Sequence, residues 1–221
     1  MQRRQLLTAL AAATVAPALA HARDQVTRVP LSNAFLLLSD YLKLAPDKRN
    51  LFHFSYLVRR KGKPAPDTKA AYLLPDGTRT PVAFGADGEV TNLPTLAQLS
   101  SKAKFETDGP AVEFGLELRL SAKPTADLEV AALESALAQA NAAVSVFSEG
   151  QGGRLTDAYF PDATTGQVVF ANGRTTALRI FDFPNLGRIP YIDLRHVSGA
   201  QTVKLDHAPS RVLLGGPPHR S

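Results

Sequence analysis

Side chains of the kinds that active sites use are concentrated near the C-terminal end of the sequence. Residues 188–207 contain Arg188, Tyr191, Asp193, Arg195, His196, Asp206 and His207. A carboxylate beside an imidazole orients the ring and favours its charged form, so an Asp–His set can hold a metal ion or act as an acid–base pair. The two Asp–His sets would form one site if residues 192–196 and 203–207 lay side by side.

The same residues have a second, purely structural interpretation. Tyr191, Leu194 and Val197 would point inward, and the charged side chains between them would point to solvent, as in a half-exposed strand or turn. Both interpretations are open at this point. The candidate ligand-binding residues are Arg188, Tyr191, Asp193, His196 and His207, and no residue is assigned a catalytic role.

The sequence lacks the motifs of several common enzyme classes. It has no cysteine and its single methionine is Met1, which excludes thiolate nucleophiles, disulfides and metal sites built on Cys or Met. It has no G-x-S-x-G, Walker or H-E-x-x-H motif. No helical pattern follows the glycine-rich segment at residues 150–153, so we interpret this segment as a flexible, mobile connection. We expect no cofactor and no bound metal.

Two main helices are expected to position the chain around these residues. The first is predicted over residues 32–44, with Ser32 as its cap and apolar residues spaced for one buried face. The second is predicted over residues 123–144, with Thr125 as its cap and acidic residues in its first turn. Alanine fills most inward positions of the second helix, which suits close packing against a sheet.

Alternating apolar and polar residues predict strands between and after the helices. Residues 51–58 and 111–120 alternate most clearly, as half-buried strands do. Asp76-Gly77 and Asn172-Gly173 each separate two apolar runs, which predicts two hairpins. The predicted fold class is therefore α+β, rich in antiparallel sheet.

The two halves of the chain show signs of a divergent duplication. Gly77 and Gly173 are separated by 96 residues, as are Pro94 and Pro190, and apolar positions agree better than residue identities do. At this offset the two predicted helices also coincide. The alternative is one continuous α+β domain in which hairpins recur. The expected organisation is a cleaved leader at 1–22, α+β halves at 23–124 and 125–215, and a loose tail at 216–221.

The N-terminal 22 residues have the features of an export signal. Arg3 and Arg4 precede an uncharged, alanine-rich stretch that ends in small-x-small cleavage patterns. The arginine pair resembles a twin-arginine signal, although Gln2, Leu6 and Thr8 depart from its usual core. An ordinary secretory signal is the alternative. We expect a periplasmic or secreted protein, and no later segment is expected to span a membrane, so the mature chain is predicted to be soluble.

The charge of the mature chain gives little indication of a partner. The whole chain has 25 Lys and Arg against 20 Asp and Glu, and removing Arg3 and Arg4 leaves 23 against 20. This small excess does not indicate a nucleic-acid partner. One basic cluster could contact an anionic surface such as lipid headgroups, or could form a solvated loop that protects a sheet edge: Arg59, Arg60, Lys61 and Lys63.

These observations favour an exported, non-catalytic envelope protein that binds a partner protein or a small ligand. The alternative is a metal-dependent or acid–base hydrolase that uses the region from Asp193 to His207. The sequence does not identify the ligand or the partner.

Overall fold

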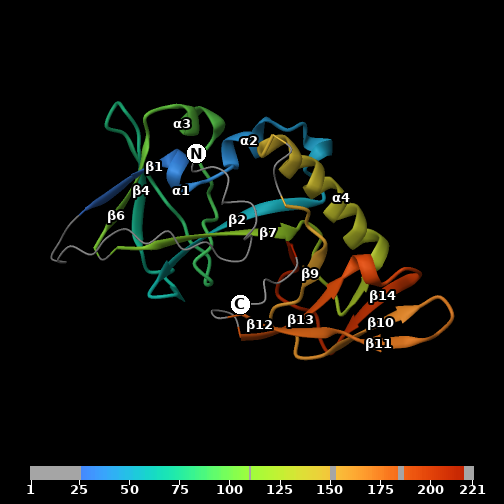
Figure 1. Cartoon of the computed structure of the whole chain (residues 1–221). Helices are drawn as coiled ribbons and strands as arrows, with labels where there is room; N and C mark the ends of the chain where they lie inside the picture. The colour runs from blue at the N-terminus through green and yellow to red at the C-terminus, as the bar shows by residue number, and fades with distance from the viewer. Residues whose placement is uncertain (1–25, 110, 150–152, 184–186, 217–221) are drawn as a thin grey trace. The chain divides into compact units, whose positions relative to one another are not determined.

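The computed structural model describes residues 26–109, 111–149, 153–183 and 187–216 (Figure 1). The expected leader, most of the glycine-rich connection and the tail after Gly216 lie outside these residues. The fold is sheet-rich α+β, with 40% strand, 21% helix and antiparallel sheets. This result confirms the predicted fold class at the level of secondary-structure content.

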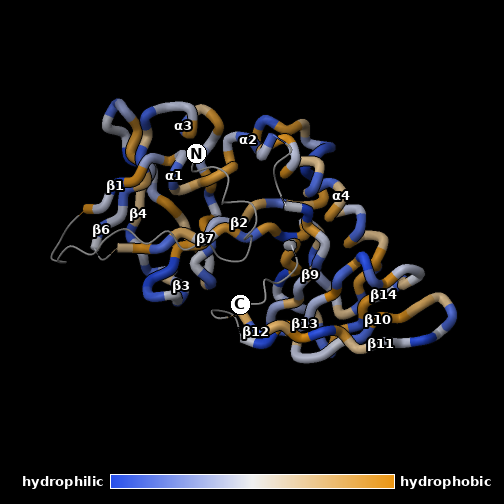
Figure 2. The backbone as a smooth tube through the Cα atoms, viewed as in Figure 1, coloured by the Kyte–Doolittle hydropathy of each residue, from blue (hydrophilic) through white to orange (hydrophobic). Residues whose placement is uncertain are grey.

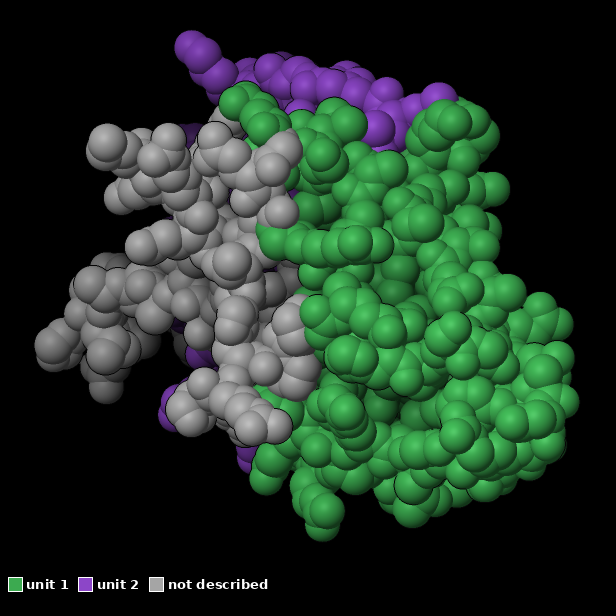
Figure 3. Space-filling view, turned by 45° about the vertical axis from the view of Figure 1, so that its right-hand side comes forward, with its two compact units in different colours: residues 1–11, 46–53, 118–221 green, residues 12–45, 54–117 purple. Residues whose placement is uncertain are grey.

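The described chain divides into two compact units, which Figure 3 colours separately. Unit 1 comprises Pro46–His53 and the chain from Leu118 onward, and unit 2 comprises the chain up to Ala45 together with Phe54–Glu117. Each unit contains one four-stranded sheet, and a seven-stranded sheet contains the remaining strands. The division falls within two strands of the seven-stranded sheet, β2 (Phe52–Arg60) and β7 (Glu113–Leu120).

Unit 2 is built around a sheet with the strand order β1-β6-β4-β5. Its strands are β1 (Thr27–Pro30), β4 (Lys69–Leu73), β5 (Arg79–Pro81) and β6 (Lys104–Asp108). Its helices are α1 (Leu31–Ala34), α2 (Leu38–Lys43) and α3 (Leu96–Ser100). Edge-to-face rings form its core, with Phe35 against Tyr56, Tyr72 and Phe105 at centroid distances of 5.1, 5.8 and 5.9 Å.

The first predicted helix is interrupted, so the expectation of one helix over residues 32–44 is wrong. Leu37 adopts a left-handed conformation (φ 65°), which ends the helical path between α1 and α2. Ser32 makes no capping bond, because α1 already begins at Leu31. The break leaves both Phe35 and Leu38 fully buried, so core packing outweighs helix continuity here.

Unit 1 contains a sheet with the order β11-β10-β14-β8 and the long helix α4 (Val130–Phe147). The sheet strands are β8 (Asp127–Glu129), β10 (Gly166–Phe170), β11 (Thr175–Ala177) and β14 (Ala200–Leu205). A 3-10 turn, η2 (Pro46–Lys48), also belongs to this unit. The strands of the seven-stranded sheet follow the order β12 (Arg179–Phe183), β13 (Gly187–Asp193), β9 (Asp157–Tyr159), β15 (Leu213–Gly215), β7, β2 and β3 (Lys63–Pro64).

The second predicted helix begins later than expected. Asp127–Glu129 is not a first helical turn but strand β8, which pairs with β14 through Leu128 opposite Val203. Thr125 therefore does not cap α4, and its hydroxyl donates to the carbonyl of Asp127 instead. A helix that began at these residues would leave its first backbone N–H groups without partners inside the helix. Pairing with β14 gives the backbone of Asp127–Glu129 hydrogen-bond partners instead.

Helix α4 also changes one expectation about membrane segments. By length and composition alone its 18 residues could cross a membrane, which the sequence analysis did not expect of any segment after the leader. The apolar character comes from a buried face that includes Leu133, Leu137 and Ala140. Figure 2 shows hydrophobic and hydrophilic residues alternating along this helix, as in a helix with one buried face.

Strand β2 is more deeply buried than the alternation predicted. The alternation predicted one buried face, and Phe52, Phe54 and Tyr56 form it, but Ser55 and Leu57 on the opposite face are buried as well. His53 is half-buried rather than solvent-facing. A strand covered on both faces does not need polar residues on either face, so alternation alone could not show this environment.

Both predicted hairpins are present. Strands β4 and β5 are joined at Asp76-Gly77, and β10 and β11 at Asn172-Gly173. Both glycines have positive φ, 87° and 78°, which is why the turns need glycine at this position.

Candidate functional site

Two buried carboxylates face each other on neighbouring strands of unit 1. Strands β9 and β13 pair antiparallel with Asp157 opposite Asp193, and the exposed fractions of these residues are 0% and 8%. Side chains of opposed residues share one face of a sheet. The structural interpretation of the sequence placed the Asp193 side chain in solvent. This expectation is wrong, because Asp193 is buried against β9.

Asp193 is held by the residues that follow it. It caps the 3-10 turn η3 (Leu194–His196), where Oδ1 accepts a bond from the Arg195 backbone N–H at 3.0 Å. The Arg195 guanidinium donates from Nε at 2.9 Å and from Nη2 at 2.7 Å, and His196 Nε2 lies 3.5 Å from Oδ2. These contacts, the Arg195 side chain above all, lower the pKa of Asp193.

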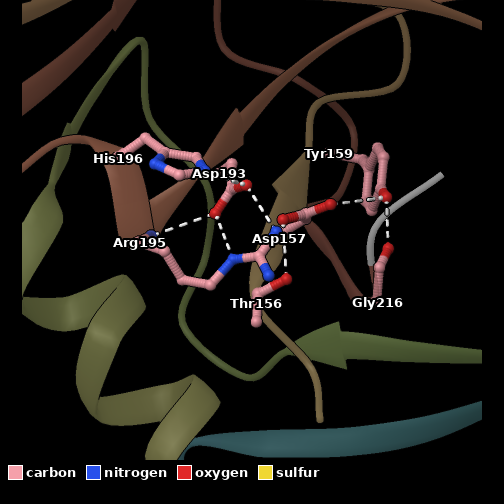
Figure 4. A network of polar contacts seen from close by, with 7 residues as sticks. All are labelled: Thr156, Asp157, Tyr159, Asp193, Arg195, His196 and Gly216. Carbon is pink, nitrogen blue, oxygen red and sulfur yellow. Dashed lines mark hydrogen bonds and ion pairs between the residues drawn. The ribbon is translucent and has the colours of Figure 1, made fainter. Parts of the chain in front are cut away.

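Asp157 has the opposite environment. Its Oδ1 accepts a bond from the Thr156 hydroxyl at 2.9 Å, and its Oδ2 lies 3.1 Å from Tyr159 Oη (Figure 4). Burial raises the pKa of Asp157; the charge of Asp193 adds to this effect, and Arg195 opposes it. The Tyr159 hydroxyl also reaches the Gly216 carbonyl at 2.6 Å, next to the end of β15.

Aromatic rings continue from this network to the edge strand β12. Tyr159 stacks on Tyr191 at 5.5 Å and meets Phe183 edge-on at 5.3 Å, and Phe183 contacts Phe181 at 4.7 Å. Tyr191, Phe181 and Phe183 are half-buried. The other candidate on β13, Arg188, is exposed and lies opposite Asp182 of β12.

The second Asp–His set lies elsewhere in the unit. Asp206 is 3.2 Å from His207 and accepts bonds from the Thr164 backbone and hydroxyl, which lower the pKa of Asp206 to about 2. Strand β14, which precedes it, pairs with β10 and β8, whereas β13 pairs with β12 and β9. The strands that carry the two sets are therefore not neighbours. Within the described ranges, no three His, Asp or Glu side chains are grouped to hold a metal ion.

Half of the network was missed by the sequence analysis. Asp157 and Tyr159 belong to the three-residue strand β9 and Thr156 directly precedes it, a few residues after the glycine-rich segment, and no strand was assigned there. The available signal was the sequence TDAYF at residues 156–160, in which Asp157 and Tyr159 alternate with Ala158 and Phe160. Five residues are too few for periodicity to be distinctive.

The basic cluster of unit 2 is partly neutralised by carboxylates. Arg59 lies 3.6 Å from Glu117, and Arg60 lies 3.4 Å from Asp67 and also donates to Thr68. Lys61 and Lys63 are exposed, at the turn between β2 and β3 and on β3 itself. Contact with an anionic surface through this cluster stays a prediction.

The chain was compared with protein-family models, with curated proteins and with solved structures, and none of the three comparisons finds a match. The fold is α+β with antiparallel sheets, and the site is a buried carboxylate network beside an aromatic sheet edge.

Proposed function

We propose that this chain is an exported, non-catalytic protein that binds a partner protein, and that the partner adds an extended segment to the edge of β12. The N-terminal leader is the reason for placing it in the periplasm or outside the cell. A small ligand in place of a protein is the other form of this proposal, and Arg188 and Tyr191 lie beside the same edge strand.

The observation that carries the proposal is the character of β12. It is a five-residue strand at the end of its sheet, and all five residues pair with β13 on one side. At the other end of the sheet, β3 has two residues, a lysine and a proline, which are the usual protection of an exposed edge. β12 contains neither lysine nor proline, although Arg179 and Asp182 are exposed charges on it, and Ile180 is 40% exposed beside half-buried Phe181 and Phe183. An extended peptide gains main-chain hydrogen bonds and side-chain contacts at such an edge.

The internal bonding of the carboxylates supports a non-catalytic role. Asp193 has bonds from Arg195 on both oxygens, and Asp157 is completely buried with polar neighbours at both oxygens. A general acid or base must reach the proton that it transfers. For the alternative, an acid–base hydrolase in the region from Asp193 to His207, the supporting observation is the pair of opposed carboxylates.

We also propose that the two halves arose by duplication, because their sheets are connected alike. β1, β6, β4 and β5 follow in the same order as β8, β14, β10 and β11. In both hairpins the same three bonds recur 96 residues apart: Leu74 N–H to Thr78 O, Gly77 N–H to Leu74 O, and Thr78 N–H to Asp76 Oδ1 correspond to bonds within residues 170–174. α1 contacts β1 and β6, as α4 contacts β8 and β14.

Site-specific photocrosslinking tests the binding proposal. With p-benzoylphenylalanine in place of Ile180, the protein exported by its own leader should form one discrete adduct with a single partner, identified by mass spectrometry. Val146, which is 67% exposed on α4, provides a matched control position of similar character. No adduct at 180, or the same adducts at both positions, would contradict a binding edge at β12. The variants His196→Ala and His207→Ala should retain the adduct.

A further inference from the structure

We infer that Asp157 carries a proton in the folded protein, and that this proton forms a pH-sensitive latch that holds the C-terminal strand β15 on β9. The latch consists of Asp157 Oδ2, Tyr159 Oη and the carbonyl of Gly216. The inference concerns a regulatory device and does not depend on the partner proposed for β12.

The number of hydrogens at Tyr159 Oη carries the inference. The hydroxyl lies between two oxygens, the Gly216 carbonyl at 2.6 Å and Asp157 Oδ2 at 3.1 Å. A tyrosine has one hydroxyl hydrogen, and a carbonyl has none to donate. If Asp157 is ionised, one of these two oxygen–oxygen contacts has no hydrogen, and an unmade bond between buried acceptors is costly.

Protonation of Asp157 satisfies both contacts. Asp157 Oδ2 then donates to Tyr159 Oη, and Tyr159 donates its own hydrogen to the Gly216 carbonyl. Asp157 Oδ1 remains the acceptor for the Thr156 hydroxyl at 2.9 Å. Complete burial of Asp157 also favours the neutral form, and raises the pKa of this carboxyl.

The charges around Asp157 come from three elements. Asp193 lies opposite on β13 and disfavours an additional negative charge, whereas hydroxyl hydrogens that Thr156 and Tyr159 donate to Asp157 favour it. Arg195 of η3 favours ionisation, but its guanidinium is bonded to Asp193, which His196 also contacts. The residues of β15 and its end that face the pair are Gly215, opposite Asp157, and Gly216, which bring no charge.

The latch acts where the last strand joins the sheet. Leu213, Leu214 and Gly215 lie opposite Tyr159, Ala158 and Asp157, and the Thr156 N–H donates to the Gly215 carbonyl at 2.8 Å. Because the folded-state pKa is raised, the stabilisation from this proton is complete below about pH 4, the unfolded-state pKa. It is lost as the pH rises through the folded-state value, which loosens β15.

Carbon-13 NMR of the full chain measures the proton directly. The Asp157 carboxyl should titrate above the ordinary aspartate value, whereas Asp206, with its pKa of about 2, serves as a control in the same spectra. Relative to the intrinsic, base-catalysed exchange rate, the protection of the amides of Thr156 and β15 should fall over the pH range in which Asp157 titrates. An Asp157 pKa at or below the ordinary value would overturn the inference.

Asp157→Asn provides the second test. The asparagine amide can donate permanently to Tyr159 Oη while its carbonyl accepts from Thr156, so the protection of the β15 amides relative to the intrinsic exchange rate should no longer depend on pH. Tyr159→Phe should accelerate the exchange at all pH values. If Asp157→Asn and the wild type show the same pH dependence, the latch is wrong. If Asp157→Asn does not fold, the carboxyl titration of the wild-type chain still decides the question.

Discussion

Two aspartates that lie opposite each other on neighbouring strands have pKa values displaced in opposite directions. Asp193 has a guanidinium on both oxygens, whereas Asp157 has only hydroxyl groups at its oxygens among the described residues. The bonds from Arg195 lower the pKa of Asp193, whereas burial raises the pKa of Asp157. The sequence could locate Asp193 but not this difference, because Arg195 is two residues away in sequence whereas Asp157 belongs to another strand.

At the residue scale, Asp193→Asn should destabilise the protein by about 1–3 kcal/mol at pH 7, because it removes charge-assisted bonds from Arg195. The folded-state pKa of Asp193 is lowered, so its stabilisation is complete above the unfolded-state value of about 4 and is lost as the pH falls through the folded value. Urea unfolding at several pH values should show the difference between wild type and variant shrinking below about pH 4. The exposed neighbour variant Arg188→Gln is the control and should show little change at any pH. A difference that is constant from pH 3 to pH 7 would contradict this account.

At the scale of elements, the sequence predicted hairpins better than helices. A turn is specified by two adjacent residues, and one Asx-Gly turn recurs three times with the same bonds, at residues 74–78, 85–89 and 170–174. A helix boundary instead depends on distant residues. α4 starts late because β14 pairs with Asp127–Glu129, and the first helix breaks at Leu37 so that the residues on both sides of the break are buried.

The three turn glycines should differ in their tolerance of a side chain. Gly77 and Gly88 both have positive φ, but a Cβ on Gly77 would meet nothing within 4 Å, whereas one on Gly88 would lie 2.4 Å from the Val58 carbonyl oxygen. Gly77→Ala should cost about 1–2 kcal/mol, the strain of the left-handed conformation. Gly88→Ala has the same strain and also displaces the bond from Val58 N–H to the Gly88 carbonyl at 2.8 Å.

Thermal or urea unfolding of the two variants measures this contrast. Gly88→Ala should lower the free energy of unfolding clearly more than Gly77→Ala, and Gly173→Ala should resemble Gly77→Ala because its surroundings are equally open. Equal losses at Gly77 and Gly88 would show that the contact with β2 is not retained in solution.

At the scale of the whole molecule, a fixed sequence offset reveals only part of the relation between the halves. The offset between corresponding residues is 96 at the hairpin turns, and Ala70 of β4 aligns with Gly166 of β10 at this offset. Their partners on β6 and β14 are Thr107 and Leu205, which are 98 residues apart. Helices α1 and α4 begin at Leu31 and Val130, which are 99 residues apart. Pro94 and Pro190 are not equivalent, because Pro190 lies inside β13 and Pro94 lies in the loop before α3. Small insertions therefore shift corresponding residues out of register, and a comparison at one constant offset does not align them.

An experimentally determined structure tests the duplication through a feature that strand order does not fix. Order and antiparallel pairing alone allow a helix on either face of a four-stranded sheet. If the halves are related, superposing β1, β6, β4 and β5 on β8, β14, β10 and β11 should place α1 and α2 over the same face as α4. Equivalent buried positions, Leu31 with Val130 and Leu38 with Leu137, should then coincide within each core. Helices on opposite faces would show that the two sheets share only a common way of pairing strands, because a change of face requires a different path of the chain through the whole unit.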